Sequence, residues 1–166
     1  MNVNSNTYTY TFATVMVVLV AVLLSGASLG LKSKQASNIS QEKKQSILAS
    51  IGIEVDRSES DAAFGEYIKQ SLTLQGGTVV SEDASAAFDI DMAAAIKAGN
   101  MDRSVPLYVA EKEGDTYYII PMRGKGLWGP VWGYLALESD GNTVVGATFD
   151  HKSETPGLGA EITTSM

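Results

Sequence analysis

The sequence predicts an α+β protein that begins with a transmembrane helix, continues with a helical segment and ends in an antiparallel β-sheet. Three observations predict this class: an uncharged apolar run over residues 12–31, apolar residues at three- and four-residue steps over residues 47–72, and two pairs of apolar runs with turn signals after residue 104. Because the helical patterns precede the strands and do not alternate with them, an α+β fold is favoured over a wound parallel sheet.

Residues 12–31 read FATVMVVLVAVLLSGASLGL and contain no charged residue. About twenty apolar residues in a helix can span the hydrocarbon core of a bilayer, so this run predicts a transmembrane helix. The alternative is a cleaved signal peptide. Three features oppose it: residues 1–11 contain no Lys or Arg, the run is too long for the apolar region of a signal peptide, and no A-x-A cleavage site follows it. Small residues in the run predict packing against helices of other membrane subunits, with a monomeric anchor as the alternative: Ser25, Gly26, Ala27, Ser28 and Gly30.

The segment between the span and residue 100 is predicted to be mainly helical, and residues 35–45 leave the span either as a linker or as a continued helix. Ser40 is a candidate N-cap for a helix that stops at Gly52, and a second helical pattern covers residues 58–72. Residues 86–98 contain a further short helix or turn.

Two predicted β-hairpins follow. PLYVAEKEGDTYYIIPM reads as two strands around a turn at Gly114–Asp115, and VWGYLALESDGNTVVGATFD repeats this arrangement with SDGN as its turn. The predicted organisation has three parts: residues 1–34 with the transmembrane helix, residues 35–100 as a helical linker and the first part of the soluble domain, and residues 101–166 as the β region.

The composition excludes several classes of site. The net charge is -7 and the sequence pI is about 4.6, so nucleic acid is not an expected partner. The chain has no cysteine and one histidine, which excludes disulfides, thiolate nucleophiles, Fe–S clusters and multi-His metal sites formed by this chain. We predict no catalytic residue and no metal ligand, and we interpret Glu154 and Glu161 as loop-fixing and ligand-contacting residues.

The stretch RGKGLWGPVWG, residues 123–133, contains the pattern G-x-G-x-x-G. A dinucleotide fingerprint opens a helix, whereas Pro130 and a strand pattern follow here, so the sequence argues against a dinucleotide site. The stretch then reads as a long connection between the two hairpins. Its two cations and two tryptophans predict either a wall for an anionic planar ligand or a corner whose tryptophans fill the core: Arg123, Lys125, Trp128 and Trp132.

A second loop, ETPGLG at residues 154–159, follows the last predicted strand. Thr155-Pro156-Gly157 favours a tight turn, and Gly157 and Gly159 allow the backbone to approach a ligand. A plain connecting turn is the alternative.

The order of these features resembles one family. A transmembrane helix, an α+β domain, RGKGLWGPVWGYLAL and then ETPGLGAEI are similar to the family formed by the C subunits of the Na+-translocating NADH:quinone oxidoreductases. The G subunit of the Rnf complex and other FMN-binding domains are close kin of that family. The resemblance covers essentially the whole chain.

The resemblance implies a cofactor, partners and site residues. In that family a separate flavin transferase attaches FMN through its phosphate to a threonine, and the flavin passes single electrons in a complex that oxidises NADH, reduces quinone and exports Na+. The sites for NADH and quinone are then expected in other subunits. Carried over to this chain, the resemblance places six residues against the flavin: Trp128, Glu154, Thr155, Gly157, Leu158 and Gly159.

The flavin-bearing threonine of the family lies in a Ser-Gly-Ala-Thr motif downstream of ETPGLG. We expect that motif beyond Met166, so that this sequence is a C-terminally incomplete fragment. Thr148, in Gly146-Ala147-Thr148, is a decoy by our interpretation, because it precedes ETPGLG and lies inside a predicted strand. His151 lies near the loop, where proton transfer to flavin and a solvent-facing strand end are the two interpretations.

The orientation of the chain in the membrane and its function each have more than one interpretation. Lys32, Lys34, Lys43 and Lys44 all follow the span, so the positive-inside rule alone places the C-terminal domain in the cytoplasm. The resemblance implies a single-pass protein of the bacterial inner membrane with its soluble domain in the periplasm, and we follow it. The alternative functions are an Rnf-type electron transport subunit and a membrane-anchored ligand-binding module without redox chemistry.

Overall fold

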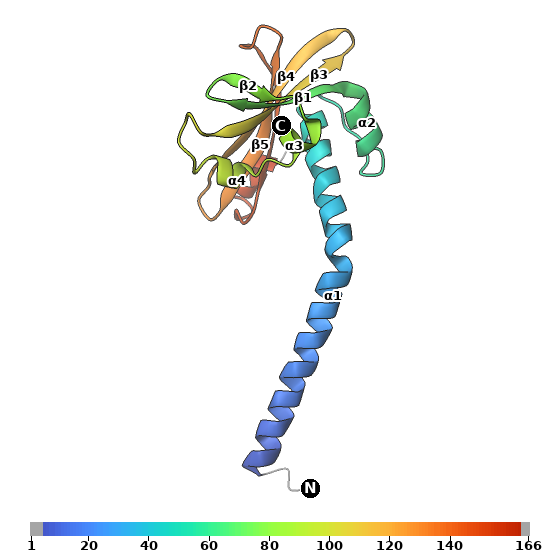
Figure 1. Cartoon of the computed structure of the whole chain (residues 1–166), viewed down its shortest axis with the longest axis vertical. Coiled ribbons are helices and arrows are strands. Elements are labelled where there is room, and N and C mark those ends of the chain that lie inside the picture. The colour runs from blue at the N-terminus through green and yellow to red at the C-terminus, as the bar shows by residue number, and fades with distance from the viewer. Residues whose placement is uncertain (1–4, 164–166) are drawn as a thin grey trace. The chain divides into compact units, whose positions relative to one another are not determined.

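The computed structural model describes residues 5–163, and the chain falls into two compact units, residues 1–40 and residues 41–166 (Figure 1). The helices are α1 (Asn6–Ala49), α2 (Ser60–Tyr67), α3 (Ala84–Phe88), α4 (Met92–Ala95) and the 3-10 helix η1 (Ala160–Thr163). The strands are β1 (Ile68–Gln75), β2 (Thr78–Ser81), β3 (Ser104–Lys112), β4 (Asp115–Lys125), β5 (Pro130–Glu138) and β6 (Val144–His151). The predicted α+β class is confirmed.

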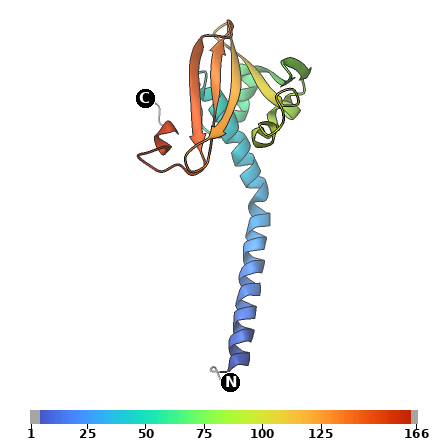
Figure 2. The same ribbon diagram turned by 90° about the vertical axis from the view of Figure 1, so that its left-hand side faces the viewer.

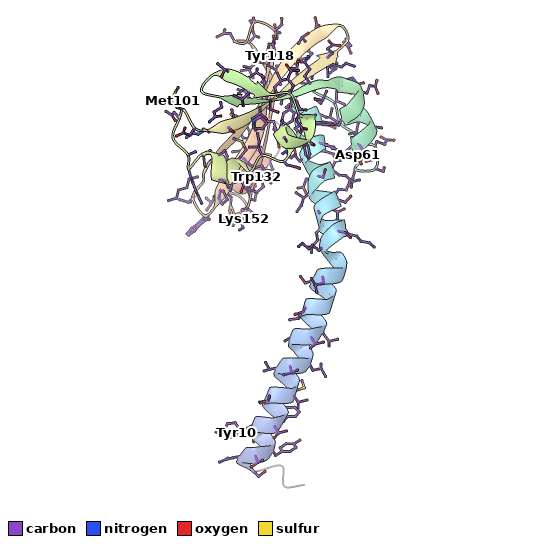
Figure 3. All side chains as sticks on the ribbon, in the orientation of Figure 1. Tyr10, Asp61, Met101, Tyr118, Trp132 and Lys152 are labelled. Carbon is purple, nitrogen blue, oxygen red and sulfur yellow. The ribbon has the colours of Figure 1, made fainter. Side chains whose placement is uncertain are left out.

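Within the described residues, α1 is the one helix that is long and apolar enough to cross a membrane. The side chains of residues 12–31 are all exposed, as expected for a helix that faces lipid on every side (Figure 3). The predicted new helix at Ser40 is wrong, because α1 continues through Ser40 to Ala49. The predicted stop is correct: Gly52 has a φ of +71°, which ends the helical path.

The strands of the second unit form one antiparallel sheet within residues 5–163, in the order β2-β1-β3-β4-β5-β6 (Figure 2). Both predicted hairpins are present. The β3–β4 turn is centred on Glu113 and Gly114, whose φ angles of 57° and 96° suit a two-residue hairpin turn. In the β5–β6 turn, the Thr143 hydroxyl and the Thr143 and Asn142 amides donate to Asp140 and lower the pKa of its carboxyl.

The predicted helix over residues 58–72 is only half correct. Helix α2 ends at Tyr67, and the chain continues directly into β1, which pairs with β3 through seven residue pairs from Ile68↔Ala110 to Gln75↔Ser104. The sheet therefore has six strands where the sequence indicated four. Gly76 and Gly77 form the β1–β2 turn, and both have positive φ angles.

One face of the sheet forms the core under the last turns of α1. Five residues lie opposite one another in successive strands from β1 to β6: Ser71, Tyr108, Ile119, Ala136 and Gly146. From Tyr108 in β3 to Gly146 in β6 the side chains of this row decrease in size. At Gly146 the end of α1 comes so close that the carbonyl oxygen of Ser50 lies 2.5 Å from the position that a Cβ would take. One helical turn earlier, Ser46 accepts a hydrogen bond from Thr148 at 3.0 Å. Ile47 and Leu48 of α1 are completely buried.

Two lysines near the end of α1 join it to α2 and α3. Lys43 donates a hydrogen bond to the carbonyl of Phe88 and lies 4.2 Å from the centre of its ring. Lys44 forms an ion pair with Asp61 at 2.7 Å and lies 5.5 Å from the ring centre of Phe64. These contacts belong to the unit of residues 41–166, so both lysines are part of the fold of the soluble domain.

The opposite face of the sheet is also apolar but more open. Because side chains alternate along a strand, the neighbours of the core residues point to this second face. Leu107, Val109, Tyr118 and Leu135 are half-buried there, and Ile120 is 36% exposed, whereas adjacent Ile119 is 0% exposed. The two faces therefore differ in burial and not in hydrophobicity.

Candidate functional site

The stretch RGKGLWGPVWG forms a tight turn between paired strands. The pairing of β4 with β5 continues to Lys125↔Pro130, which leaves only residues 126–129 outside the ladder, and we call these residues the glycine turn. Within it the Gly126 amide donates to the Gly129 carbonyl at 2.7 Å. The expected long connection between hairpins is therefore wrong. Strands on both sides agree with the argument against a dinucleotide site, since no helix begins here.

The ETPGLG loop, residues 154–159, folds back on itself after β6. The carbonyl of Thr155 accepts hydrogen bonds from the amides of Leu158, Gly159 and Ala160 at 3.1–3.2 Å. Gly157 has a φ of +78°, a conformation that favours glycine, and its amide donates to Glu161 at 3.0 Å. The loop is thus a compact turn that leads into η1.

Glu154 joins the ETPGLG loop to the glycine turn. Its side chain is 7% exposed, and its Oε1 atom accepts hydrogen bonds from the amides of Trp128 at 3.0 Å and Gly129 at 3.2 Å. These two bonds fit the expected loop-fixing role of Glu154. Two segments that are about 25 residues apart in the sequence form one structural feature at the end of the sheet marked by Trp132 and Lys152 (Figure 3).

The two tryptophans of this region have different surroundings. Trp128 is 66% exposed, so the interpretation that it fills the core is wrong. Trp132 is half-buried in β5 opposite Arg123 of β4, and the Arg123 guanidinium lies 5.8 Å from its ring centre. The apolar side chains that the two loops expose are Leu127 at 73%, Trp128 and Leu158 at 77%.

His151 has a structural contact at the end of β6. Its Nδ1 atom accepts a hydrogen bond from the Glu154 amide at 3.2 Å, and its own amide donates to Asp150 at 2.7 Å. The imidazole therefore supports the entry to the ETPGLG loop. Within residues 5–163 no group of three or more His, Cys, Asp or Glu side chains is placed to hold a metal ion.

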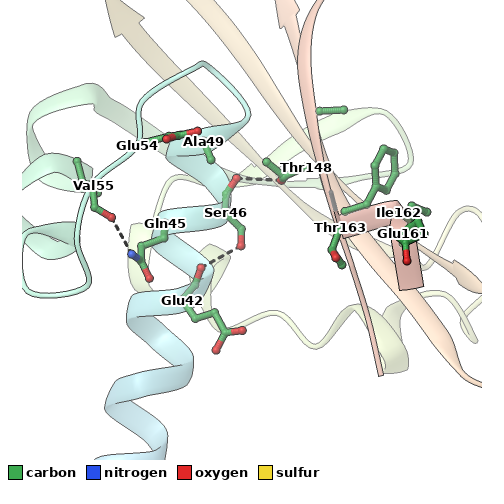
Figure 4. A pocket seen from close by; sticks show the side chains of 12 residues that line it. Glu42, Gln45, Ser46, Ala49, Glu54, Val55, Thr148, Glu161, Ile162 and Thr163 are labelled. Atoms are coloured by element: carbon green, nitrogen blue, oxygen red, sulfur yellow. Dashed lines mark hydrogen bonds between the residues drawn. The ribbon is translucent and has the colours of Figure 1, made fainter. Parts of the chain in front are cut away.

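A cleft of about 1070 Å³ lies beside η1, which directly follows the ETPGLG loop (Figure 4). It is lined by the last turns of α1, by Glu54 and Val55, by residues 147–149 of β6 and by η1. Its walls carry three carboxyl groups, from Glu42, Glu54 and Glu161, and no Lys, Arg or His of the described residues. No sequence pattern indicated this cleft, because its walls come from segments about 100 residues apart.

The structure brings the six predicted cofactor-binding residues together. Five of them form the ETPGLG loop, and Trp128 is bound to that loop through Glu154. Thr148 lies inside β6, as predicted, and donates its hydroxyl hydrogen to Ser46 (Figure 4). The contacts that sequence reasoning missed are those of Ser153, which donates to the Trp128 carbonyl at 3.2 Å, and of His151.

Comparison with known proteins relates these features to a family. Residues 126–165, which include both loops, match the FMN-binding domain family. The C subunit of the Na(+)-translocating NADH-quinone reductase of Vibrio campbellii is 33% identical over 162 residues, and the corresponding protein of Pseudomonas aeruginosa is 35% identical over 162 residues. Each alignment covers 86% of this chain and 62% of the relative.

A solved structure is also similar to this chain. The crystal structure of the C subunit of the Na(+)-translocating NADH-quinone reductase of Parabacteroides distasonis superposes with a TM-score of 0.73 at 41% identity, covering 81% of this chain and 64% of that one. These comparisons confirm the resemblance that the order of the motifs predicted. The chain spans less than two-thirds of the length of each of these relatives.

Proposed function

We infer that this chain, which is similar to the C subunit of the Na(+)-translocating NADH-quinone reductase, is the membrane-anchored flavoprotein subunit of such a complex. It holds FMN as a one-electron carrier in an enzyme that oxidises NADH, reduces quinone and exports Na+. The observation that carries this proposal is the pair of loops joined by Glu154, because both loops lie in the part that matches the FMN-binding domain family. The sites for NADH and quinone lie in other subunits.

The residues of the two loops suit the ring of a flavin. A flavin site needs apolar side chains against the ring and backbone that approaches its polar edge. Trp128 and Leu158 supply exposed apolar side chains, and Gly157 and Gly159 leave space for a close backbone approach. We propose that Thr155 and Glu154 complete this contact set, so that all six predicted residues line the ring. Bound FMN would supply the one-electron chemistry, and the loops would orient it.

The phosphate of FMN belongs outside the cleft next to η1. Three glutamates line that cleft and no basic residue of the described part of the chain does, so its walls would repel a phosphate dianion. Thr148 lines the same cleft and already donates its hydroxyl hydrogen to Ser46. Both observations disfavour attachment at Thr148. We propose that a flavin transferase attaches FMN to a threonine beyond Met166.

The other partners are membrane subunits of the same complex. We propose that α1 crosses the bacterial inner membrane once and that the soluble domain lies on the periplasmic side. The positive-inside rule opposed this orientation with four lysines after the span. Two of them, Lys43 and Lys44, pack on aromatic rings of the soluble domain, so only Lys32 and Lys34 remain as a signal next to the span.

The alternatives are an Rnf-type subunit and an anchored module that binds a ligand without redox chemistry. The relatives named above are all C subunits of the sodium-pumping enzyme, which favours the first proposal over the Rnf type. The match to the FMN-binding domain family favours a flavin over another ligand.

The test is covalent flavinylation. The chain, a version extended past Met166 through the coding sequence, and Thr148→Val in both lengths are each produced together with the flavin transferase. Flavin fluorescence is then read on a denaturing gel. We expect fluorescence in the extended version and in its Thr148→Val variant, and none in the shorter chain.

Other outcomes would change specific parts of the proposal. Fluorescence of the shorter chain that Thr148→Val abolishes would place the attachment at Thr148. The absence of flavin fluorescence from every sample would contradict covalent attachment of FMN. Titration of the same proteins with FMN under native conditions would then separate a flavin held without a covalent bond from a module that binds no flavin.

A further inference from the structure

Glu154 is a buried carboxylate in a part of the protein that is otherwise exposed. Glutamate side chains are rarely buried unless they are paired or hydrogen-bonded, yet the Glu154 side chain is 7% exposed, while Thr155 and Leu158 of the same loop are exposed. The hydrogen bonds that its Oε1 atom accepts come from backbone amides of the glycine turn. The Glu154 carboxylate therefore fixes the backbone of the glycine turn.

Gly126 and Gly159 lie so close to the Glu154 carboxylate that neither position has room for a side chain. A Cβ on Gly126 would lie 2.3 Å from Oε1 of Glu154, and a Cβ on Gly159 would lie 2.7 Å from its Oε2. Neither glycine has the positive φ that would itself demand glycine, in contrast to Gly157. The Glu154 carboxylate therefore leaves no room for a side chain at Gly126 or Gly159. At Gly126 a Cβ would also lie 2.9 Å from Cγ1 of Val131 and 3.0 Å from the Gly129 carbonyl oxygen.

Glu154 and the residue before it, Ser153, bind the backbone of Trp128 on both sides. Its amide donates to Oε1 of Glu154 at 3.0 Å, and its carbonyl accepts from the Ser153 hydroxyl at 3.2 Å. The Glu154 amide is in turn bound to Nδ1 of His151. The indole of Trp128 is 66% exposed, so a fixed backbone presents a free aromatic side chain.

We propose that Glu154 is a positioning residue that acts through the backbone of Trp128. By fixing the Trp128 and Gly129 amides, it sets where the indole lies relative to the ETPGLG loop, and so determines the shape of the surface that receives a planar aromatic ligand. The proposed function enters this inference at one point: it identifies the planar aromatic ligand as the flavin ring. The distance between the two loops depends on the length of the Glu154 side chain.

The test compares three substitutions that separate length from charge. Glu154→Gln keeps the length and an oxygen that accepts both amides, Glu154→Asp is shorter by one methylene group, and Glu154→Ala removes the acceptor. Glu111→Gln, on an exposed position of β3, is the matched control. Each full chain is prepared in detergent, and its melting temperature is compared with that of the wild type.

The first measurement uses no flavin. Hydrogen exchange of the Trp128 and Gly129 amides is followed by NMR. We expect exchange at least about tenfold faster in Glu154→Ala and Glu154→Asp, the effect of losing a hydrogen bond to a charged acceptor, and near wild-type exchange in Glu154→Gln and Glu111→Gln. Unchanged exchange in Glu154→Ala would overturn the proposal.

The second measurement adds FMN and follows the quenching of its fluorescence, with Trp128→Ala as the reference for loss of the indole. We expect Glu154→Ala and Glu154→Asp to lose as much quenching as Trp128→Ala, and Glu154→Gln to restore it. Full quenching in Glu154→Ala would overturn the positioning role. If the wild type itself does not quench added FMN, the two loops of this chain do not hold free FMN, and the exchange pattern alone decides whether Glu154 fixes the loops.

Discussion

Ile119 and Ile120 are neighbours in β4 with opposite surroundings. Ile119 is 0% exposed in the core between Tyr108 and Ala136, whereas Ile120 is 36% exposed on the other face of the sheet. We expect Ile119→Ala to lower the free energy of unfolding by about 2–5 kcal/mol, because it leaves a cavity, and Ile120→Ala to lower it by about 1 kcal/mol or less. Chemical denaturation measures both values. Equal losses would contradict the assignment of the two faces.

At the scale of single residues, the sequence analysis named residues for a candidate site but not the contacts between them. The resemblance carried by ETPGLG and the Gly-Leu-Trp motif named residues that the structure brings together. The bonds of Glu154 to Trp128 and Gly129 could not be predicted, because they join positions 26 and 25 residues apart and depend on the pairing of β5 with β6. Burial of a carboxylate has no local signature in a sequence.

The end of α1 and strand β6 meet through a glycine. A Cβ on Gly146 would lie 2.5 Å from the backbone oxygen of Ser50, whereas a Cβ on Gly65, in α2, would meet nothing within 4 Å. We expect Gly146→Ala to destabilise the protein by about 1–3 kcal/mol, because the helix must move away from the sheet. Gly65→Ala is the matched control, and it should stabilise α2 by about 0.5–1 kcal/mol. Thermal unfolding of the two variants compares these effects, and a Gly146→Ala variant as stable as wild type would show that α1 does not contact β6 so closely.

Strand β1 explains why the sequence analysis missed part of the sheet. Its buried positions include Ser71 and Thr73, while Leu72 and Leu74 are only half-buried, so the apolar side chains do not mark its core face. The register also shifts between Ile68 and Gln70, which interrupts the alternation expected of a strand. The remaining apolar residues fit a helical spacing with those of α2. The strands of the two hairpins, with their clear turns, were predictable.

At the scale of the whole molecule, the last turns of the long apolar helix α1 pack within the domain that carries the sheet. Residues 41–166 form one compact unit, and Ile47 and Leu48 of α1 lie fully buried in it. We expect a chain of residues 41–166 to fold without detergent and a chain of residues 53–166 to remain unfolded, because the shorter one lacks the helix that covers the core face of the sheet. Circular dichroism and NMR dispersion distinguish the two states. A folded 53–166 chain would contradict this role of α1.

The strand order β2-β1-β3-β4-β5-β6 has a consequence for how the protein behaves in concentrated solution. β2 and β6 are the outermost strands, and each leaves backbone groups on one side without a strand partner in the described sheet. Exposed valines lie on both, Val79 and Val80 on β2 and Val144 and Val145 on β6, and neither strand contains the Lys or Pro that commonly prevents edge-to-edge association. Edge-to-edge pairing through β2 and β6 is therefore the association expected when the unit of residues 41–166 is concentrated without α1's apolar residues.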